Sequence, residues 1–151
     1  FEGNFEGNNF TISNLYINRP TGANVGLFTS GSGEFKNIRL KDVNITGGWL
    51  VGSLMGRTGY YTGYIENCFV ENAIIRSEDD AGGLIGESSA TIKKSAVINV
   101  DIIGNGDYIG GFVGENEGVI TESYVTGKVE NVYDKDTSSV MTGGFVGRNN
   151  E

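Results

Sequence analysis

Residues that could support catalysis are few in this sequence. Among its 151 residues there is one cysteine, Cys68, and no histidine. Without histidine, a Ser-His-Asp or Cys-His catalytic arrangement and a His-ligated metal site are excluded within this chain. Cys68 could act as a nucleophile, but a lone cysteine is more often a buried structural residue, and serines take its place in later copies of a repeat. The sequence therefore predicts no catalytic residue.

Acidic residues precede several glycine pairs and could gather on one edge of the molecule as calcium ligands. They are Asp79, Asp80, Asp107, Asp134 and Asp136. Their number and offset vary and no D-x-D-x-D-G loop is present, so solvated loops are the better interpretation. We predict no metal site and no cofactor, and calcium binding by these aspartates stays open.

The stretch from Arg57 to Tyr64 is the best candidate for a ligand-binding surface. It places Tyr60, Tyr61 and Tyr64 in a glycine-flanked loop, where flat amphipathic rings can contact a sugar or a protein. Trp49 precedes this loop and could join the surface or fill a bend. The alternative is a purely structural role, in which these tyrosines cover the exposed end of a small core.

Composition and charge restrict the partners and the setting of the chain. Nineteen acidic and eleven basic residues give a net charge of -8, which argues against nucleic acid or anionic lipid as a partner. Apolar runs are far shorter than the roughly 20 residues of a membrane span, so membrane insertion is not expected. One cysteine allows no internal disulfide. The chain begins without a methionine and stops within a repeat, so we expect flanking domains in a longer protein.

A repeated motif organises the elements that must position these residues. The best copy is Gly110-Gly111-Phe112-Val113-Gly114, and four more copies begin at Gly26, Gly52, Gly82 and Gly143. Equivalent positions recur every 23 to 33 residues. Self-similarity at such a period is typical of a stacked array. Helical spacing of apolar residues is almost absent, so short strands separated by bends are expected.

Aligning the copies gives columns of similar residues. The first is Ile12, Phe35, Ile65, Ile92 and Ile120; the second is Leu15, Ile38, Cys68, Ser95 and Ser123; the third is Ile17, Leu40, Val70, Val97 and Val125. A step of two residues from the second to the third column predicts a strand with both side chains on one face. The other face receives Tyr16, Arg39, Phe69, Ala96 and Tyr124.

Bends are expected on either side of this strand. The three-residue step from the first to the second column predicts a bend that holds Asn14, Asn37, Asn67, Lys94 and Glu122. A second bend should follow three residues beyond the third column, although Val129 falls one place late in the fourth copy. Glycine pairs fit corners that need a positive φ or a close approach of the next coil.

These patterns predict an all-β fold, a parallel β-helix or β-solenoid of about five repeats of roughly 27 to 30 residues. We expect a single segment over residues 1–151, with a lead-in rung at 1–24 and repeats over 25–149.

The repeats resemble the GLUG-motif family, named for a Gly-Leu-x-Gly core that occurs here as Gly83-Leu84-Ile85-Gly86. Residues 110–129 are similar to a near-complete unit of that family. The resemblance implies a secreted or cell-surface bacterial protein, since such repeats occur in the non-catalytic parts of immunoglobulin A metallopeptidases and in other large surface proteins. It supplies no catalytic residues.

The first hypothesis is therefore a non-catalytic segment that acts as a spacer, a substrate-docking module or an adhesin, with a host protein or a glycan as ligand. The alternative is a polysaccharide lyase or hydrolase, which would need acidic and basic residues at matching outward positions of successive coils. The outward column contains one charged residue, Arg39, and therefore favours the non-catalytic hypothesis.

Overall fold

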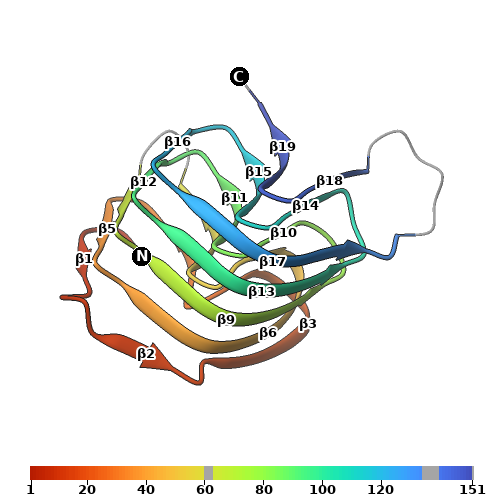
Figure 1. Cartoon of the computed structure of the whole chain (residues 1–151), viewed down its shortest axis with the longest axis horizontal. Helices are drawn as coiled ribbons and strands as arrows, with labels where there is room; N and C mark the ends of the chain where they lie inside the picture. Colours follow the sequence, from red (N-terminus) through yellow and green to blue (C-terminus); the bar gives the residue numbers. More distant parts are fainter. Residues whose placement is uncertain (60–62, 134–139, 151) are drawn as a thin grey trace.

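The chain winds into stacked coils, and each coil crosses three parallel β-sheets (Figure 1). This computed structural model describes residues 1–59, 63–133 and 140–150, and no residue in these ranges is helical. The all-β parallel solenoid expected from the repeats is confirmed. None of the described residues forms a helix long and apolar enough to cross a membrane.

Two of the sheets have five short strands each. The first sheet contains β1 (Phe5–Glu6), β5 (Glu34–Lys36), β8 (Tyr64–Glu66), β12 (Thr91–Lys93) and β16 (Val119–Thr121). The third sheet contains β4 (Phe28–Gly31), β7 (Met55–Thr58), β11 (Ile85–Ser88), β15 (Val113–Asn116) and β19 (Val146–Asn149).

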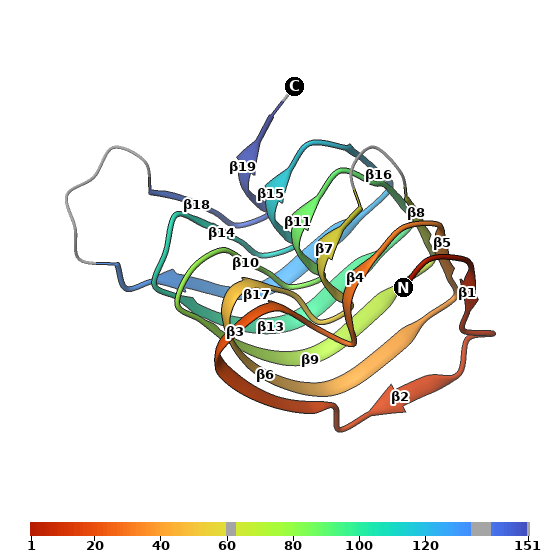
Figure 2. The same cartoon turned by 180° about the vertical axis from the view of Figure 1, so that it is seen from behind.

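The remaining strands form a broad, bent sheet, whose long members lie side by side in both views (Figures 1 and 2). They are β2 (Thr11–Ser13), β3 (Tyr16–Val25), β6 (Arg39–Val51), β9 (Phe69–Ser77), β10 (Ala81–Gly82), β13 (Ala96–Gly104), β14 (Tyr108–Gly110), β17 (Tyr124–Asn131) and β18 (Met141–Gly143).

Strand pairing confirms most of the predicted columns. Phe35 pairs with Ile65, Ile65 with Ile92 and Ile92 with Ile120, so these coils are 27 to 30 residues long. The third column pairs in the same way from Leu40 to Val125. Side chains of both columns in the middle coils are fully buried, because each is covered by its equivalents above and below.

The predicted register of the first coil is wrong. Phe5 pairs with Phe35, whereas Ile12 pairs with Leu40 and Ile17 with Ile45. Tyr16 likewise lies beside Asn44, so Thr11 and not Tyr16 continues the outward row of Arg39. No glycine motif precedes Gly26, so nothing in the sequence marks the start of the first coil. Its β-branched residues fit the columns equally well when they are aligned with the preceding strand of the next coil, and this gives the wrong register.

Both predicted bends are present, and they are built mainly by asparagine rather than by glycine. At the first bend the backbone takes a positive φ of 49° to 56° at Asn37, Asn67, Lys94 and Glu122. Asn14 was assigned there but belongs to the second bend, where φ is also positive at Asn14, Asp42, Asn72, Asn99 and Gly127. Asparagine and aspartate tolerate this conformation better than other non-glycine residues.

The prediction that Val129 is a late counterpart of Val100 is wrong. Val129 pairs with Ile102, and Gly127 pairs with Val100 because the register shifts after Val97. The fourth copy has thus lost one residue at the second bend, and Gly127 spans it with a φ of +139°.

The glycine that opens each motif is required by close approach and not by a positive φ. A Cβ atom on Gly110 would lie 2.0 Å from the carbonyl oxygen of Val113 and 2.6 Å from the backbone nitrogen of Gly147 in the next coil. Of the two explanations offered for the glycine pairs, close approach is the correct one here.

Candidate binding surfaces

The predicted aromatic site is only partly described by the structure. Tyr60 and Tyr61 lie outside the described residues. Tyr64 begins β8 in the first sheet, where it is half-buried and the Nζ of Lys36 is 5.1 Å from its ring centroid. Trp49 lies in β6 of the broad sheet and is 61% exposed, so it does not fill a bend. The two residues are thus in different sheets, and a binding role for the loop stays a prediction.

Cys68 has the structural role that was favoured for it. Its side chain is buried, and its Sγ lies 3.5 Å from the carbonyl oxygens of Phe35 and Glu66. The backbone N–H of Cys68 donates to Ser95 Oγ, and that of Ser95 donates to Ser123 Oγ. Burial raises the pKa of the Cys68 thiol to about 12, so it carries no thiolate at neutral pH. The column links coils by hydrogen bonds.

The acidic turn residues also join coils. Asp79 Oδ1 accepts a hydrogen bond from the backbone N–H of Asp107, and Asp80 Oδ1 accepts one from that of Tyr108. Within the described ranges, no group of three or more Asp, Glu or Cys residues is placed to hold a metal ion. Asp134 and Asp136, the other calcium candidates, lie outside those ranges. Sequence reasoning missed the role of Asp79 and Asp80, although both lie one coil before the turn whose N–H groups donate to them.

Asp80 should make the stability of the protein depend on pH. Burial raises the pKa of its carboxyl to about 7, and Asp79, Glu115 and Asp107 add to the effect. The folded state therefore keeps a proton that the unfolded chain loses near pH 4. This contribution to stability is complete below about pH 4 and is lost as the pH rises through about 7.

The Asp80→Asn variant tests this dependence, because its amide oxygen can still accept the Tyr108 hydrogen bond. We expect the variant to be more stable than the unaltered chain at pH 8 by about 1–2 kcal/mol, after allowance for solvent screening of a half-buried group. The difference should shrink as the pH is lowered to 4. Urea unfolding at several pH values measures it, and a difference that is constant from pH 4 to 8 would contradict the assignment.

An amide ladder follows the second bend on the outer face of the broad sheet. Asn72 Nδ2 donates to Asp42 Oδ1 over 3.0 Å, and Asn99 Nδ2 donates to Asn72 Oδ1 over 2.9 Å. A shallow hollow of about 380 Å³ runs along it. Its lining also includes Val43, Asn44, Ala73, Ile74 and Asp101. Amide groups, the carboxylates of Asp42 and Asp101 and the partly exposed Ile74 suit contact with a polar ligand that carries no negative charge.

Charged residues occupy two further outward rows, which the sequence analysis did not consider. Arg76 and Asp101 form an ion pair of 3.1 Å between neighbouring coils, and Lys128 pairs with Glu130 within β17. Strand alternation from Val97 and Val125 could have located them. Acids and bases therefore do lie on successive coils, as the lyase alternative requires, but each is joined to an opposite charge. The Arg76–Asp101 pair favours a role in coil stacking, whereas the Lys128–Glu130 pair stays within one strand.

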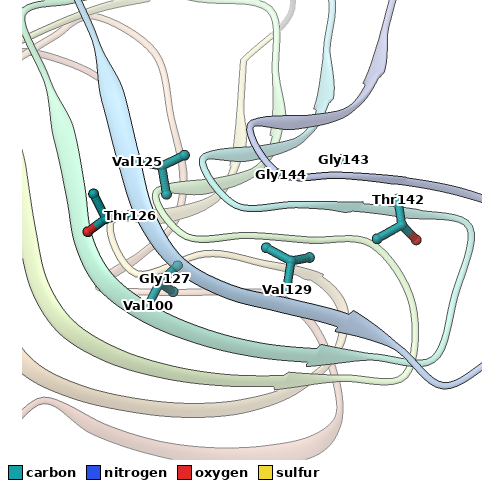
Figure 3. A pocket seen from close by; sticks show the side chains of 8 residues that line it. All are labelled: Val100, Val125, Thr126, Gly127, Val129, Thr142, Gly143 and Gly144. Carbon is teal, nitrogen blue, oxygen red and sulfur yellow. The ribbon is translucent and has the colours of Figure 1, made fainter.

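A second hollow lies at the end of the stack, beyond β17 and β18 (Figure 3). Its volume is about 370 Å³. The lining residues are Val100, Val125, Thr126, Gly127, Val129, Thr142, Gly143 and Gly144. Figure 3 shows Val125 and Val129 on β17 facing the segment that contains Gly143 and Gly144. The lining has no titratable side chain, so this hollow can offer shape and apolar area but no acid–base chemistry.

Comparison with protein families identifies one coil of this stack. The family described as the GLUG motif matches residues 105–130. This coil is therefore similar to the GLUG repeat. It comprises β14, β15, β16 and most of β17, which is one turn around the three sheets. The resemblance drawn from the sequence is thereby confirmed.

The chain is also similar to halomucin of Haloquadratum walsbyi (strain DSM 16790 / HBSQ001). The two are 33% identical over 104 residues, which is 66% of this chain and 1% of halomucin. The chain thus spans a very small part of that relative. No solved structure matches the chain.

Proposed function

We propose that this chain is a non-catalytic β-solenoid segment of a secreted or cell-surface protein, where it acts as a rigid spacer that carries a docking surface. The observation that carries the proposal is the use made of the GLUG residues. Gly110 admits the neighbouring coil, Phe112 and Val113 are fully buried, and Ser123 Oγ accepts a hydrogen bond from the coil below. These motif residues serve the packing of one coil on the next, so the recognition of a ligand is left to the outer surfaces.

The parent protein that this proposal favours is an adhesin or an immunoglobulin A-type metallopeptidase with the present segment as an accessory region. A host protein or a glycan is the corresponding ligand. Support comes from the GLUG repeat and from the tyrosine-rich insertion between β7 and β8, which makes this corner of the coil longer than its equivalents. Aromatic residues at such a corner are suited to both classes of ligand.

A triple variant, with Tyr60, Tyr61 and Tyr64 each changed to serine, tests the docking surface. Immobilised immunoglobulin A and an array of mucin-type glycans serve as probes. We expect the unaltered chain to bind one of them without cleaving it, and the variant to bind at least about ten-fold more weakly with its fold intact. The matched control is Tyr124→Ser, which removes a tyrosine that is 51% exposed on β17 and should leave binding unchanged. Equal binding by the triple variant would exclude the loop, and no binding of either probe would leave only the spacer role.

A further inference from the structure

The face of the stack formed by β16, β17 and β19 is built like an interior layer that lacks its neighbour. In the preceding coil the core side chains Ile92, Val97, Ile102 and Phe112 are fully buried. Their equivalents in the last coil, which are Ile120, Val125, Val129 and Phe145, are only partly buried. Phe145 stacks on Phe112 with ring centroids 4.9 Å apart and planes at 5°. The same column therefore continues up to this face with unchanged geometry.

Gly144 marks the place that a neighbouring coil would occupy. A Cβ atom on Gly83 would lie 2.2 Å from the carbonyl oxygen of Gly111, and one on Gly111 would lie 2.1 Å from that of Gly144. At Gly144 itself, no atom of the described residues is within 4 Å of the equivalent position. Its φ is not in the left-handed region, so neither local contacts nor backbone conformation explain glycine here.

At the first bend, the last coil also lacks, within the described ranges, a backbone hydrogen bond that each earlier coil makes to its neighbour. The N–H groups of Asn37, Asn67 and Lys94 each donate to a carbonyl oxygen of the following coil, over 3.1 to 3.2 Å. Glu122 holds this position in the last coil, and its N–H has no such acceptor in the described part of the chain.

The opposite face of the stack is less suited to a neighbour. Its outer strand β3 contains Pro20, which has no N–H to donate, and its register with β6 shifts between Arg19 and Ala23. Proline and bulges are features that protect an edge strand from further pairing. The ring of Phe1 also lies against Phe5, Phe28 and Phe35 at this end, with centroids 5.4 to 6.4 Å apart.

We propose that the β16–β17–β19 face is an assembly surface whose partner is another parallel β-coil of the GLUG type. Such a coil places aliphatic side chains over Val125 and Val129, fills the 370 Å³ hollow and brings a carbonyl group against Gly144. The continuity of this face with the coil interfaces inside the chain selects this partner, since the core columns on both sides of the one-residue shift at Gly127 end here in register.

The test appends one coil in register. Because Val113 pairs with Val146, residue 151 corresponds to Gly118 and to Ala90, so a copy of residues 91–116 placed directly after residue 151 continues the pattern. In the unextended chain we expect fast hydrogen exchange at the Glu122 amide and slow exchange at that of Lys94. In the extended chain the Glu122 amide should become at least about a hundred-fold slower. Gly144→Ala should leave the unextended chain unchanged and lower the melting temperature of the extended one by several degrees.

Each other outcome overturns the proposal. An appended coil that is cleaved by a protease while Glu122 still exchanges quickly would show that the face does not accept a coil. If Gly144→Ala leaves the melting temperature of the extended chain unchanged, no carbonyl group of the added coil packs against this position. A stable dimer of the unextended chain that protects the Glu122 amide would identify a second copy as the occupant. Failure of the tyrosine variant test leaves this result untouched, because the two surfaces share no residue.

Discussion

A Gly110→Ala variant is expected to unfold at least about 10 °C below the unaltered chain, or to fail to fold. The added methyl group would meet two backbone atoms, the Val113 oxygen at 2.0 Å and the Gly147 nitrogen at 2.6 Å. Neither can move by rotating a side chain, so the corner and the next coil must shift together. The same position is glycine in all five copies of the motif. A loss of about 3 kcal/mol or more is the expected scale, and thermal unfolding followed by circular dichroism measures it.

Gly144→Ala in the same 151-residue chain is the matched control. It makes the same chemical change in the same motif, but no described atom is within 4 Å of the new methyl group. Its melting temperature should stay within about 2 °C of the unaltered chain. Equal losses in the two variants would show that glycine flexibility, and not close approach, explains the conserved pattern among the copies.

A Val97→Asp variant is expected to lose about 4–5 kcal/mol of unfolding free energy, which a segment of this size can hardly tolerate. Val97 is fully buried between Val70 below and Val125 above. Aspartate would place an unpaired carboxylate in this apolar column, where it finds no hydrogen-bond donor to replace water. Urea unfolding at pH 8 measures the loss, and the milder Val97→Thr variant keeps the shape if the aspartate variant does not fold.

Ile98→Asp is the control for that substitution. Ile98 is the next residue of β13, and its side chain points to the outer face, where it is only half-buried. We expect a loss of about 1 kcal/mol or less, because the new carboxylate stays in water. Similar losses at positions 97 and 98 would contradict the alternation of inward and outward side chains on which the register rests.

The sequence alone predicts the architecture because a stacked fold repeats its requirements. Each coil must supply an aliphatic residue above that of the previous coil, so Leu40, Val70, Val97 and Val125 align without knowledge of the structure. The first coil was misaligned because Phe5, which truly pairs with Phe35, stands outside any copy of the glycine motif. No repeat constrains that end of the chain from both sides.

The candidate sites were less predictable than the fold. The alignment of the copies locates the asparagines of the second bend and the charged residues of β9, β13 and β17. It does not predict their hydrogen-bond and ion-pair partners, because these depend on side-chain directions that spacing does not fix. Asp80 is an example, since its role rests on burial beside Asp79 of its own coil and beside Asp107 and Glu115 of the next. Tyr60 and Tyr61 stand in an insertion without counterpart in other copies, so no alignment within the chain bears on them.

The direction of the pairing between coils also determines how this segment responds to tension. The hydrogen bonds between stacked strands run along the length of the stack, so a pull on its two ends loads them a few at a time and peels the outermost coil first. Ile85 and Val113 are separated by one coil of 28 residues, which releases roughly 90 Å of extended chain when it detaches. A surface protein that contains such coils can therefore lengthen stepwise under shear while its remaining coils stay folded.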